Sequence, residues 1–339
     1  MQAIRLVTPR QLEIADIAEP QPGPEDVLVE VHFVGMCGSD LNAYRGTFPL
    51  MRYPRVLGHE ASGIVVARGA AVPDRIAEGA RVMFSPYSEC GICPSCRAGR
   101  PNCCQFNETM GLQRDGALTR MVAMHYSKVF TSDTLTLQEL ALTEPLSVGY
   151  HAANRGRISE ADTVLVMGCG VVGIGVIAAA ARKGATVIAS DIDDGKLADA
   201  QRFGARHIVN STHKDVLDTV RELTGGDGVS VAVEAVGLPQ TFRLAVDAVA
   251  YAGRVVYVGY AKHDVSYDTA LFVRKELDIC GARNALRVFP SVIKMLEERE
   301  RPFPDLITRV YPFAESGEAL RAWDADPVRF TKVMIDVTA

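Results

Sequence analysis

The stretch VLVMGCGVVGIGV, residues 164–176, constrains the fold of this chain more than any other. It places Gly168, Gly170 and Gly173 in a G-x-G-x-x-G pattern between an apolar run and a stretch with helical character. Such glycines permit a tight turn, a close approach of backbone to a pyrophosphate and close helix–strand packing. The pattern predicts a dinucleotide-binding unit. The plainer alternative is a glycine turn that binds nothing.

Apolar strands and helices alternate from Thr163 onward. We expect helices at 171–183 and 194–203, and strands at 163–167, 185–190, 207–210, 231–236, 254–259 and 277–281. Continuous apolar strands alternating with helices indicate a parallel sheet covered on both faces, here a doubly wound fold. Asp191 ends the second strand, where a carboxylate accepts hydrogen bonds from ribose hydroxyls and repels a 2′-phosphate. The cofactor expected is therefore NAD rather than NADP.

The parts before and after this α/β region are different in character. Strand-like runs such as 26–38 and 61–69 are broken by Pro and Gly, which is typical of a β-barrel or sandwich. An amphipathic helix at 290–298 and a strand at 331–337 close the chain. The sequence thus predicts a β-rich domain interrupted by an α/β domain.

The composition bounds the partners and the compartment. A formal net charge of −5 without a Lys/Arg-rich run argues against nucleic acid and anionic membranes as partners. No apolar run reaches the roughly 18 residues of a membrane span, and the N-terminus lacks the apolar core of a signal peptide. We therefore expect a cytoplasmic protein, in which clustered cysteines more often bind metal than form disulfides.

Five of the eight cysteines lie in CGICPSCRAGRPNCC, residues 90–104. The spacing of Cys90, Cys93, Cys96 and Cys104 suits a tetrahedral zinc site with four thiolates, which has no open position and serves to stabilise a loop. Cys103 is an alternative fourth ligand. A redox pair and a nucleic-acid-binding zinc ribbon are competing interpretations. The cluster is expected to be structural.

A second candidate site is less conspicuous. Cys37 in GMCGSDLNAY and the pair His59–Glu60 in GHEASG offer a thiolate, an imidazole and a carboxylate, all competent zinc ligands. Each has a plainer explanation when taken alone, since a single cysteine on a strand is usually core and a glutamate is usually a solvated charge.

Five motifs together resemble the zinc-dependent medium-chain dehydrogenase/reductase superfamily, in its polyol (sorbitol) dehydrogenase-like branch. They are CGSD at 37, GHE at 58, CGICPSCRAGRPNC at 90, EPLSVGYHA at 144 and GCGVVG at 168. The resemblance implies a GroES-like β-barrel catalytic domain split by a Rossmann domain. The expected boundaries are 1–147 with a zinc lobe at 88–106, then 148–282 for the cofactor, then the returning segment 283–339.

The resemblance also implies roles for single residues. It makes Cys37, His59 and Glu60 ligands of a catalytic zinc, in addition to the structural zinc of the cysteine cluster. Glu144 would bind this zinc directly or through water. Further roles implied are orientation of the zinc-bound histidine by Asp40, proton relay by Ser39, and contacts to the adenosine ribose from Asp191 and Lys196. Asn42 stands where many relatives have a histidine, so the proton path beyond Ser39 is open.

The implied reaction is oxidation of a secondary alcohol of a polyol or sugar acid to a ketone. The segment 281–290 is similar to one in sugar-acid and hexitol dehydrogenases of the L-galactonate 5-dehydrogenase type, where Arg283 would hold a hydroxyl or carboxylate. A salt bridge is the plainer role for Arg283. L-Threonine or a simple secondary alcohol is the alternative substrate.

A non-catalytic zinc-stabilised binding protein on the same fold is the alternative of another class. The family also forms homodimers or homotetramers through edges of the Rossmann domain. We expect the apolar segment 253–260 to pair across such an edge.

Overall fold

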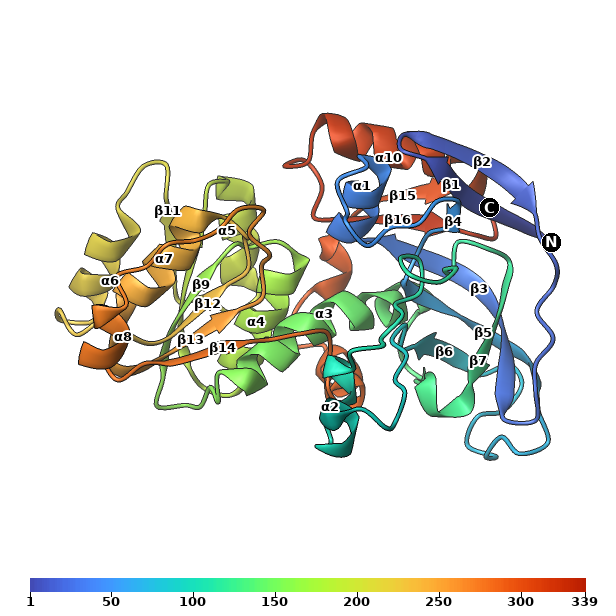
Figure 1. Ribbon diagram of the computed structural model, residues 1–339, viewed down its shortest axis with the longest axis horizontal. Coiled ribbons are helices and arrows are strands. Elements are labelled where there is room, and N and C mark those ends of the chain that lie inside the picture. The colour runs from blue at the N-terminus through green and yellow to red at the C-terminus, as the bar shows by residue number, and fades with distance from the viewer. The chain divides into compact units, whose positions relative to one another are not determined.

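The computed structural model describes residues 1–339, which form two compact units (Figure 1). Unit 1 comprises Met1–Glu144 and Phe289–Ala339, and unit 2 comprises Pro145–Val288. The chain leaves unit 1 within helix α3 (Leu137–Arg155) and returns to it at helix α9 (Phe289–Glu297). The middle of the sequence therefore builds a unit of its own, between two segments that fold together.

Unit 2 contains a six-stranded parallel sheet with the order β11-β10-β9-β12-β13-β14. Its strands are β9 (Thr163–Met167), β10 (Thr186–Asp191), β11 (His207–Asn210), β12 (Val229–Glu234), β13 (Val249–Tyr257) and β14 (Asp278–Gly281). The sheet grows in both directions from β9, so right-handed crossovers place the helices of its two halves on opposite faces. This arrangement confirms the predicted doubly wound fold.

Helices pack on this sheet through their apolar sides. Helix α4 (Val171–Arg182) packs on β9 and β10, α5 (Asp194–Arg202) on β10 and β11, and α7 (Pro239–Ala248) on β12 and β13 (Figure 1). Two further helices complete the unit, α6 (Val216–Leu223) and α8 (Ala270–Arg274). The strand residues Leu165, Ile188 and Val255 between these helices are fully buried.

The prediction that segment 253–260 forms an exposed edge is wrong. Strand β13 is hydrogen-bonded to β12 on one side and to β14 on the other. Its apolar character reflects burial on both faces of an interior strand, a pattern that looks the same in sequence as an apolar edge. The edge strand is β14, where Asp278 and Ile279 are exposed.

Unit 1 is built mainly of antiparallel strands. Its larger sheet has the order β15-β16-β3-β5-β6-β8, with β7 also paired to β3, and its smaller sheet has the order β2-β1-β4. The strands are β1 (Gln2–Thr8), β2 (Gln11–Asp16), β3 (Asp26–Met36), β4 (Arg55–Val56), β5 (Glu60–Arg68), β6 (Arg81–Phe84), β7 (Met121–His125), β8 (Val129–Thr131), β15 (Ile307–Pro312) and β16 (Lys332–Asp336).

Strand β3 is the centre of this unit. It pairs with β5 along one edge, and its other edge is shared by β7 near the start and by β16 near the end. The C-terminal strand β16 therefore lies beside the end of β3, although Met36 and Lys332 are 296 positions apart in the sequence. The helices of this unit are α1 (Gly38–Tyr44), α2 (Pro94–Arg97), α9 and α10 (Ser316–Ala325). None of the helices in the structure has the length and apolar character needed to span a bilayer.

Candidate functional site

Cys37, His59 and Glu60 lie together in unit 1. One ligand atom from each falls within 4.8 Å of the other two. Cys37 directly follows β3, and His59 and Glu60 stand at the start of β5. The antiparallel register that sets Gly35 opposite Glu60 brings the end of one strand to the beginning of the other. Backbone pairing alone therefore juxtaposes the three side chains.

Asp40 ties the two segments of this site together. Its Oδ2 accepts a hydrogen bond from the amide of Cys37 at 2.9 Å, and its Oδ1 accepts one from the amide of Gly58 at 3.5 Å. The same Oδ2 lies 3.7 Å from Nδ1 of His59. Burial raises the pKa of Asp40, while the adjacent imidazole lowers it. This carboxylate is thus placed to orient the imidazole from behind.

On the other side of the imidazole, the hydroxyl Oγ of Ser39 lies 3.5 Å from Nε2 of His59. Asn42, on the next turn of α1, has Thr47 as its neighbour, whose hydroxyl lies 3.4 Å from the amide oxygen of Asn42. Ser39 therefore stands beside the donor group, whereas Asn42 offers an amide that does not titrate near neutral pH.

Lys332 is a part of the site that sequence reasoning missed. Its ammonium donates to Oε2 of Glu60 at 2.5 Å and to the carbonyl of Met36 at 3.0 Å. Its side chain is 2% exposed, and no other lysine or arginine of the chain is classed as buried. Burial lowers the pKa of Lys332, but Glu60, Cys37 and Glu144 together raise it above its usual value. The only signal in the sequence is a lysine at the head of strand β16, directly before the apolar run VMI.

The side chain of Glu60 fills space that only a glycine leaves open. A Cβ at position 35 would stand 2.3 Å from Oε2 of Glu60, so no other residue type fits there without displacing the carboxylate. Glu60 is therefore held by backbone pairing, by Gly35 beneath it and by the ammonium of Lys332.

Glu144 approaches the same region from helix α3. Its Oε1 accepts a hydrogen bond from the hydroxyl of Tyr87, and both side chains are buried. It does not belong to the group whose ligand atoms all lie within 4.8 Å of one another. Burial raises the pKa of Glu144 to about 7, against the opposing effect of His59. Burial likewise raises the pKa of Tyr87, which remains a donor. No pattern in the sequence pointed to Tyr87.

The residues present fit a zinc ion. Oε1 of Glu60 is buried and has no hydrogen-bond partner, and Nε2 of His59 is the imidazole nitrogen on the side away from Asp40. Burial lowers the pKa of His59, but the carboxylate of Asp40 and the Cys37 thiol together raise it well above its usual value, so the surroundings favour a cation. Three donors of mixed type with room for a fourth group are typical of catalytic zinc sites.

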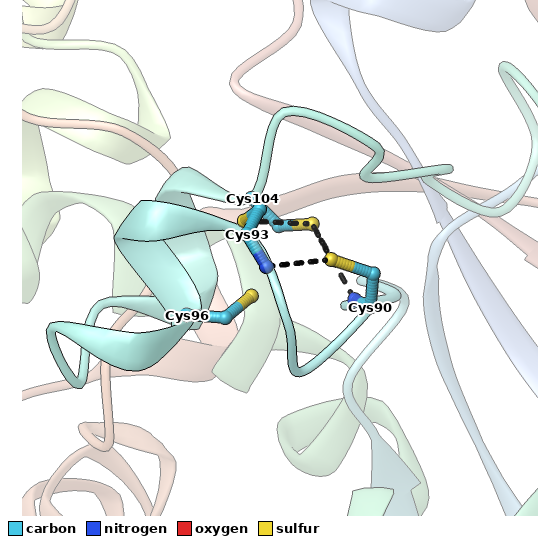
Figure 2. Close-up of side chains that lie close together, drawn as sticks. All are labelled: Cys90, Cys93, Cys96 and Cys104. Carbon is cyan, nitrogen blue, oxygen red and sulfur yellow. Dashed lines mark hydrogen bonds between the residues drawn. The ribbon is translucent and has the colours of Figure 1, made fainter.

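The cysteine lobe forms a second donor group in unit 1. The sulfur atoms of Cys90, Cys93, Cys96 and Cys104 all lie within 4.8 Å of one another, and Figure 2 shows the four side chains converging. A hydrogen bond with Ser95 lowers the pKa of Cys93 to about 5, which favours a thiolate. Cys103 is outside this group, and its sulfur lies 3.8 Å from Nη2 of Arg100. The four thiols fit a closed zinc site, with Cys104 as the fourth ligand.

The glycine-rich turn of unit 2 connects β9 to α4. Gly168 has a φ of +91°, and a Cβ at Gly173 would stand 1.8 Å from the carbonyl oxygen of Gly168. A Cβ at Gly170, which caps α4, would meet nothing within 4 Å. The helix N-terminus therefore opens onto free space, as a bound pyrophosphate requires.

The expected ribose-binding residues lie next to this turn. Asp191 is the last residue of β10, and its carboxylate accepts hydrogen bonds from the amides of Cys169 at 2.7 Å and Ile192 at 2.8 Å. Lys196 is half-buried on α5. Arg283 follows β14 and is exposed. The carboxylate of Asp191 is thus oriented by backbone groups of the turn itself.

Two family models match the chain. The alcohol dehydrogenase GroES-like domain matches residues 23–134, and the zinc-binding dehydrogenase domain matches residues 171–298. The sorbitol dehydrogenase of Bacillus subtilis is 33% identical, with 94% of this chain and 92% of the relative covered. The L-galactonate-5-dehydrogenase of Escherichia coli is 30% identical, with 91% of each covered.

Solved structures of similar proteins superpose along the whole chain. A zinc-binding dehydrogenase from Sinorhizobium meliloti 1021, bound to NADP, is 30% identical with a TM-score of 0.91, and 99% of each chain is covered. An alcohol dehydrogenase from Escherichia coli CFT073, complexed with NADH, is 28% identical with a TM-score of 0.92 and the same coverage.

Proposed function

The chain belongs to the zinc-dependent medium-chain dehydrogenase superfamily, and we propose that it transfers a hydride between NAD and a secondary alcohol of a polyol or sugar acid. The product of oxidation is a ketone. The observation that carries this proposal is the mixed donor group of Cys37, His59 and Glu60, in which the buried Oε1 of Glu60 has no hydrogen-bond partner. The names of the sorbitol and L-galactonate dehydrogenases support the substrate class.

The residues of unit 1 take separate parts in this reaction. Cys37, His59 and Glu60 would hold the catalytic zinc. Zinc supplies Lewis acidity, which lowers the pKa of a substrate hydroxyl. Ser39, at 3.5 Å from the imidazole, takes the hydroxyl proton, and Asp40 keeps the imidazole in one orientation. Because Asn42 cannot carry the proton onward, the proton passes from Ser39 to solvent or to a cofactor hydroxyl.

The turn of unit 2 is proposed to bind the cofactor. The open space at Gly170 would take the pyrophosphate at the N-terminus of α4. The carboxylate of Asp191 would accept hydrogen bonds from the ribose, with Lys196 beside it. The negative charge at Asp191 favours NAD over NADP, although solved neighbours contain either NADP or NADH. Measuring turnover with both cofactors tests this preference, and equal efficiency would overturn it.

Two zinc ions per chain are proposed, one in each donor group. A homodimer or homotetramer is also proposed, since β14 leaves one row of backbone groups unpaired at the sheet edge. The proposed compartment is the cytoplasm, because the clustered cysteines are arranged as metal donors and all eight are free thiols. Light scattering and metal analysis of the purified protein test the first two proposals.

The substrate is tested by measuring NAD reduction with polyols, aldonates, L-threonine and simple secondary alcohols. We expect the highest kcat/KM with a polyol or an aldonate. Turnover of only L-threonine or only a simple alcohol would refute the polyol and sugar-acid class and make that compound the substrate. No turnover of any compound by the zinc-loaded protein would favour a non-catalytic binding protein.

Arg283 is proposed to contact the substrate, and its role separates acidic from neutral substrates. Arg283→Ala is expected to raise KM for an aldonate far more than for a neutral polyol, because guanidinium binds carboxylate by a bidentate contact. Arg287→Ala is a matched control, since it removes an exposed arginine of the same segment. Equal effects of Arg283→Ala on KM for both substrates would refute the proposed contact between Arg283 and a substrate carboxylate.

A further inference from the structure

Either of two buried glutamates could be the third ligand in the donor group of unit 1. Glu60 and Glu144 are 1% and 3% exposed, and each could supply a carboxylate oxygen to a zinc ion. Glu60 has an oxygen within 4.8 Å of the ligand atoms of both Cys37 and His59, and Glu144 does not belong to that group. If both glutamates bound beside the Cys37 thiolate, three anionic donors would fill the site and reduce its Lewis acidity. To keep the Lewis acidity of the site, one of the two glutamates must therefore be kept from binding the ion.

We propose that Tyr87 is a positioning residue that holds Glu144 back from the donor group, leaving Glu60 as the third ligand. The proposal rests on the metal site of the proposed function. Its basis is the hydrogen bond from the Tyr87 hydroxyl to Oε1 of Glu144. A buried phenol needs a partner for its hydroxyl, and a carboxylate is a strong acceptor for it.

The segment that carries Tyr87 is anchored independently of the metal site. The carbonyl of Pro86, the residue before it, accepts hydrogen bonds from the amide of Met110 at 3.0 Å and from Nη2 of Arg114 at 3.2 Å. The Tyr87 side chain is 8% exposed. A fixed backbone and a buried ring keep the hydroxyl in place. The carboxylate bound to it is therefore restrained as well.

Glu144 is also carried on a restrained element. The hydroxyl of Ser62 in β5 donates to the carbonyl of Leu137 at 2.5 Å, which ties the first residue of α3 to the strand that carries Glu60. Glu144 stands seven residues, about two helical turns, further along α3. Helix α3 and strand β5 are therefore linked near the site. The hydrogen bond from Tyr87 further restrains the side chain of Glu144.

Glu60 has a different kind of partner. Lys332 binds its Oε2, and Gly35 leaves the space that its side chain occupies, while Oε1 has no partner. The ammonium balances the charge of Glu60 and leaves one oxygen available. Glu60 is thus presented to the donor group, whereas the phenol restrains Glu144 outside it.

The test is made on the full-length protein with cobalt(II) in place of zinc, in the wild type, Tyr87→Phe, Glu144→Gln and the double variant. The visible spectrum of Cys37→Ser gives the contribution of the cysteine lobe, which is subtracted. Removing the hydroxyl in Tyr87→Phe frees Glu144 to bind. We expect its ligand-field bands to weaken as a donor is added, and cobalt release to a chelator to slow by about tenfold, the lower end of outer-sphere effects.

The other variants make the result specific. Glu144→Gln should keep the wild-type spectrum, and adding Tyr87→Phe to it should change nothing further. The proposal is overturned if Tyr87→Phe has the spectrum and release rate of the wild type, or if its effect persists in the double variant. A changed spectrum in Glu144→Gln alone would make Glu144 a ligand already. Absence of cobalt from the Cys37 group in the wild type would instead refute the metal site itself. Thermal unfolding of each variant checks that it is folded.

Discussion

The two donor groups of unit 1 are assembled in opposite ways. The cysteine lobe draws four sulfur atoms of one kind from residues 90–104, and the turns of that segment bring them together. The second group draws one donor of each kind from Cys37, just after β3, and from the pair His59–Glu60, where β5 begins. Its supporting residue Lys332 comes from a third strand, 272 positions from Glu60.

Under the proposed function, this difference separates a site that stabilises a loop from a site that can react. Four thiolates around one ion fill a tetrahedron, so the lobe offers no place for a substrate. The mixed group has only three donors and is surrounded by groups that orient them, Asp40 behind His59 and Lys332 behind Glu60. A reactive zinc site keeps one coordination position open for the substrate. The residues that orient the three donors come from distant parts of the chain, so they meet only in the folded unit.

The sharpest way to break this comparison is to remove the single sulfur of the mixed group. Cys37→Ser should lower kcat/KM by about 1,000-fold, since Lewis-acid stabilisation of several kcal/mol is lost and each 1.36 kcal/mol is a factor of ten. Steady-state kinetics with the best alcohol of the substrate panel measures the loss. Cys103→Ser is the control, because this neighbouring thiol belongs to neither group. Comparable activity of Cys37→Ser and the wild type would refute the assignment.

Lys332→Met tests whether the mixed group depends on a residue far away in the chain. It leaves the carboxylate of Glu60 buried without its cation, a change that typically costs about 3–5 kcal/mol of folding free energy. Chemical denaturation of the metal-free protein measures it.

Lys128→Met is the matched control, since Lys128 pairs with Glu89 nearer the surface. The side chain of Lys128 is 23% exposed and that of Glu89 is 33% exposed. Partly exposed pairs contribute about 0–1 kcal/mol. Equal losses of stability in the two variants would show that burial of the Lys332 pair has no energetic consequence.

Cys93→Ser should have the smallest effect on turnover. We expect kcat to change by less than about threefold, a difference of roughly 0.7 kcal/mol in the barrier, because a closed four-sulfur site offers no position to a substrate. The bound zinc should fall by one ion per chain, and trypsin should cleave within the lobe after Arg97, which precedes an alanine. Metal analysis and limited proteolysis read these outcomes. A loss of turnover as large as that of Cys37→Ser would remove the distinction between the two groups.

Much of the molecule could be predicted because the deciding patterns are local. The alternation of strands and helices predicted the six-stranded sheet, and the five motifs predicted the family, both of which are confirmed. The edge of the sheet was predicted wrongly. Apolar residues show that a strand is buried on its faces, but not how many of its backbone edges are paired.

The sequence by itself determined the groups that form within one short segment. The four sulfurs of the lobe and the turn at Gly168 depend on spacings of a few residues, which local backbone geometry converts directly into positions. The tertiary structure alone decided that Lys332 supports Glu60 and that Tyr87 binds Glu144, since these partners lie 272 and 57 positions apart. No local period links residues so distant. Only the pairing of β16 with β3 and the burial of α3 bring their polar atoms together, because buried charges and hydroxyls must find partners inside the fold.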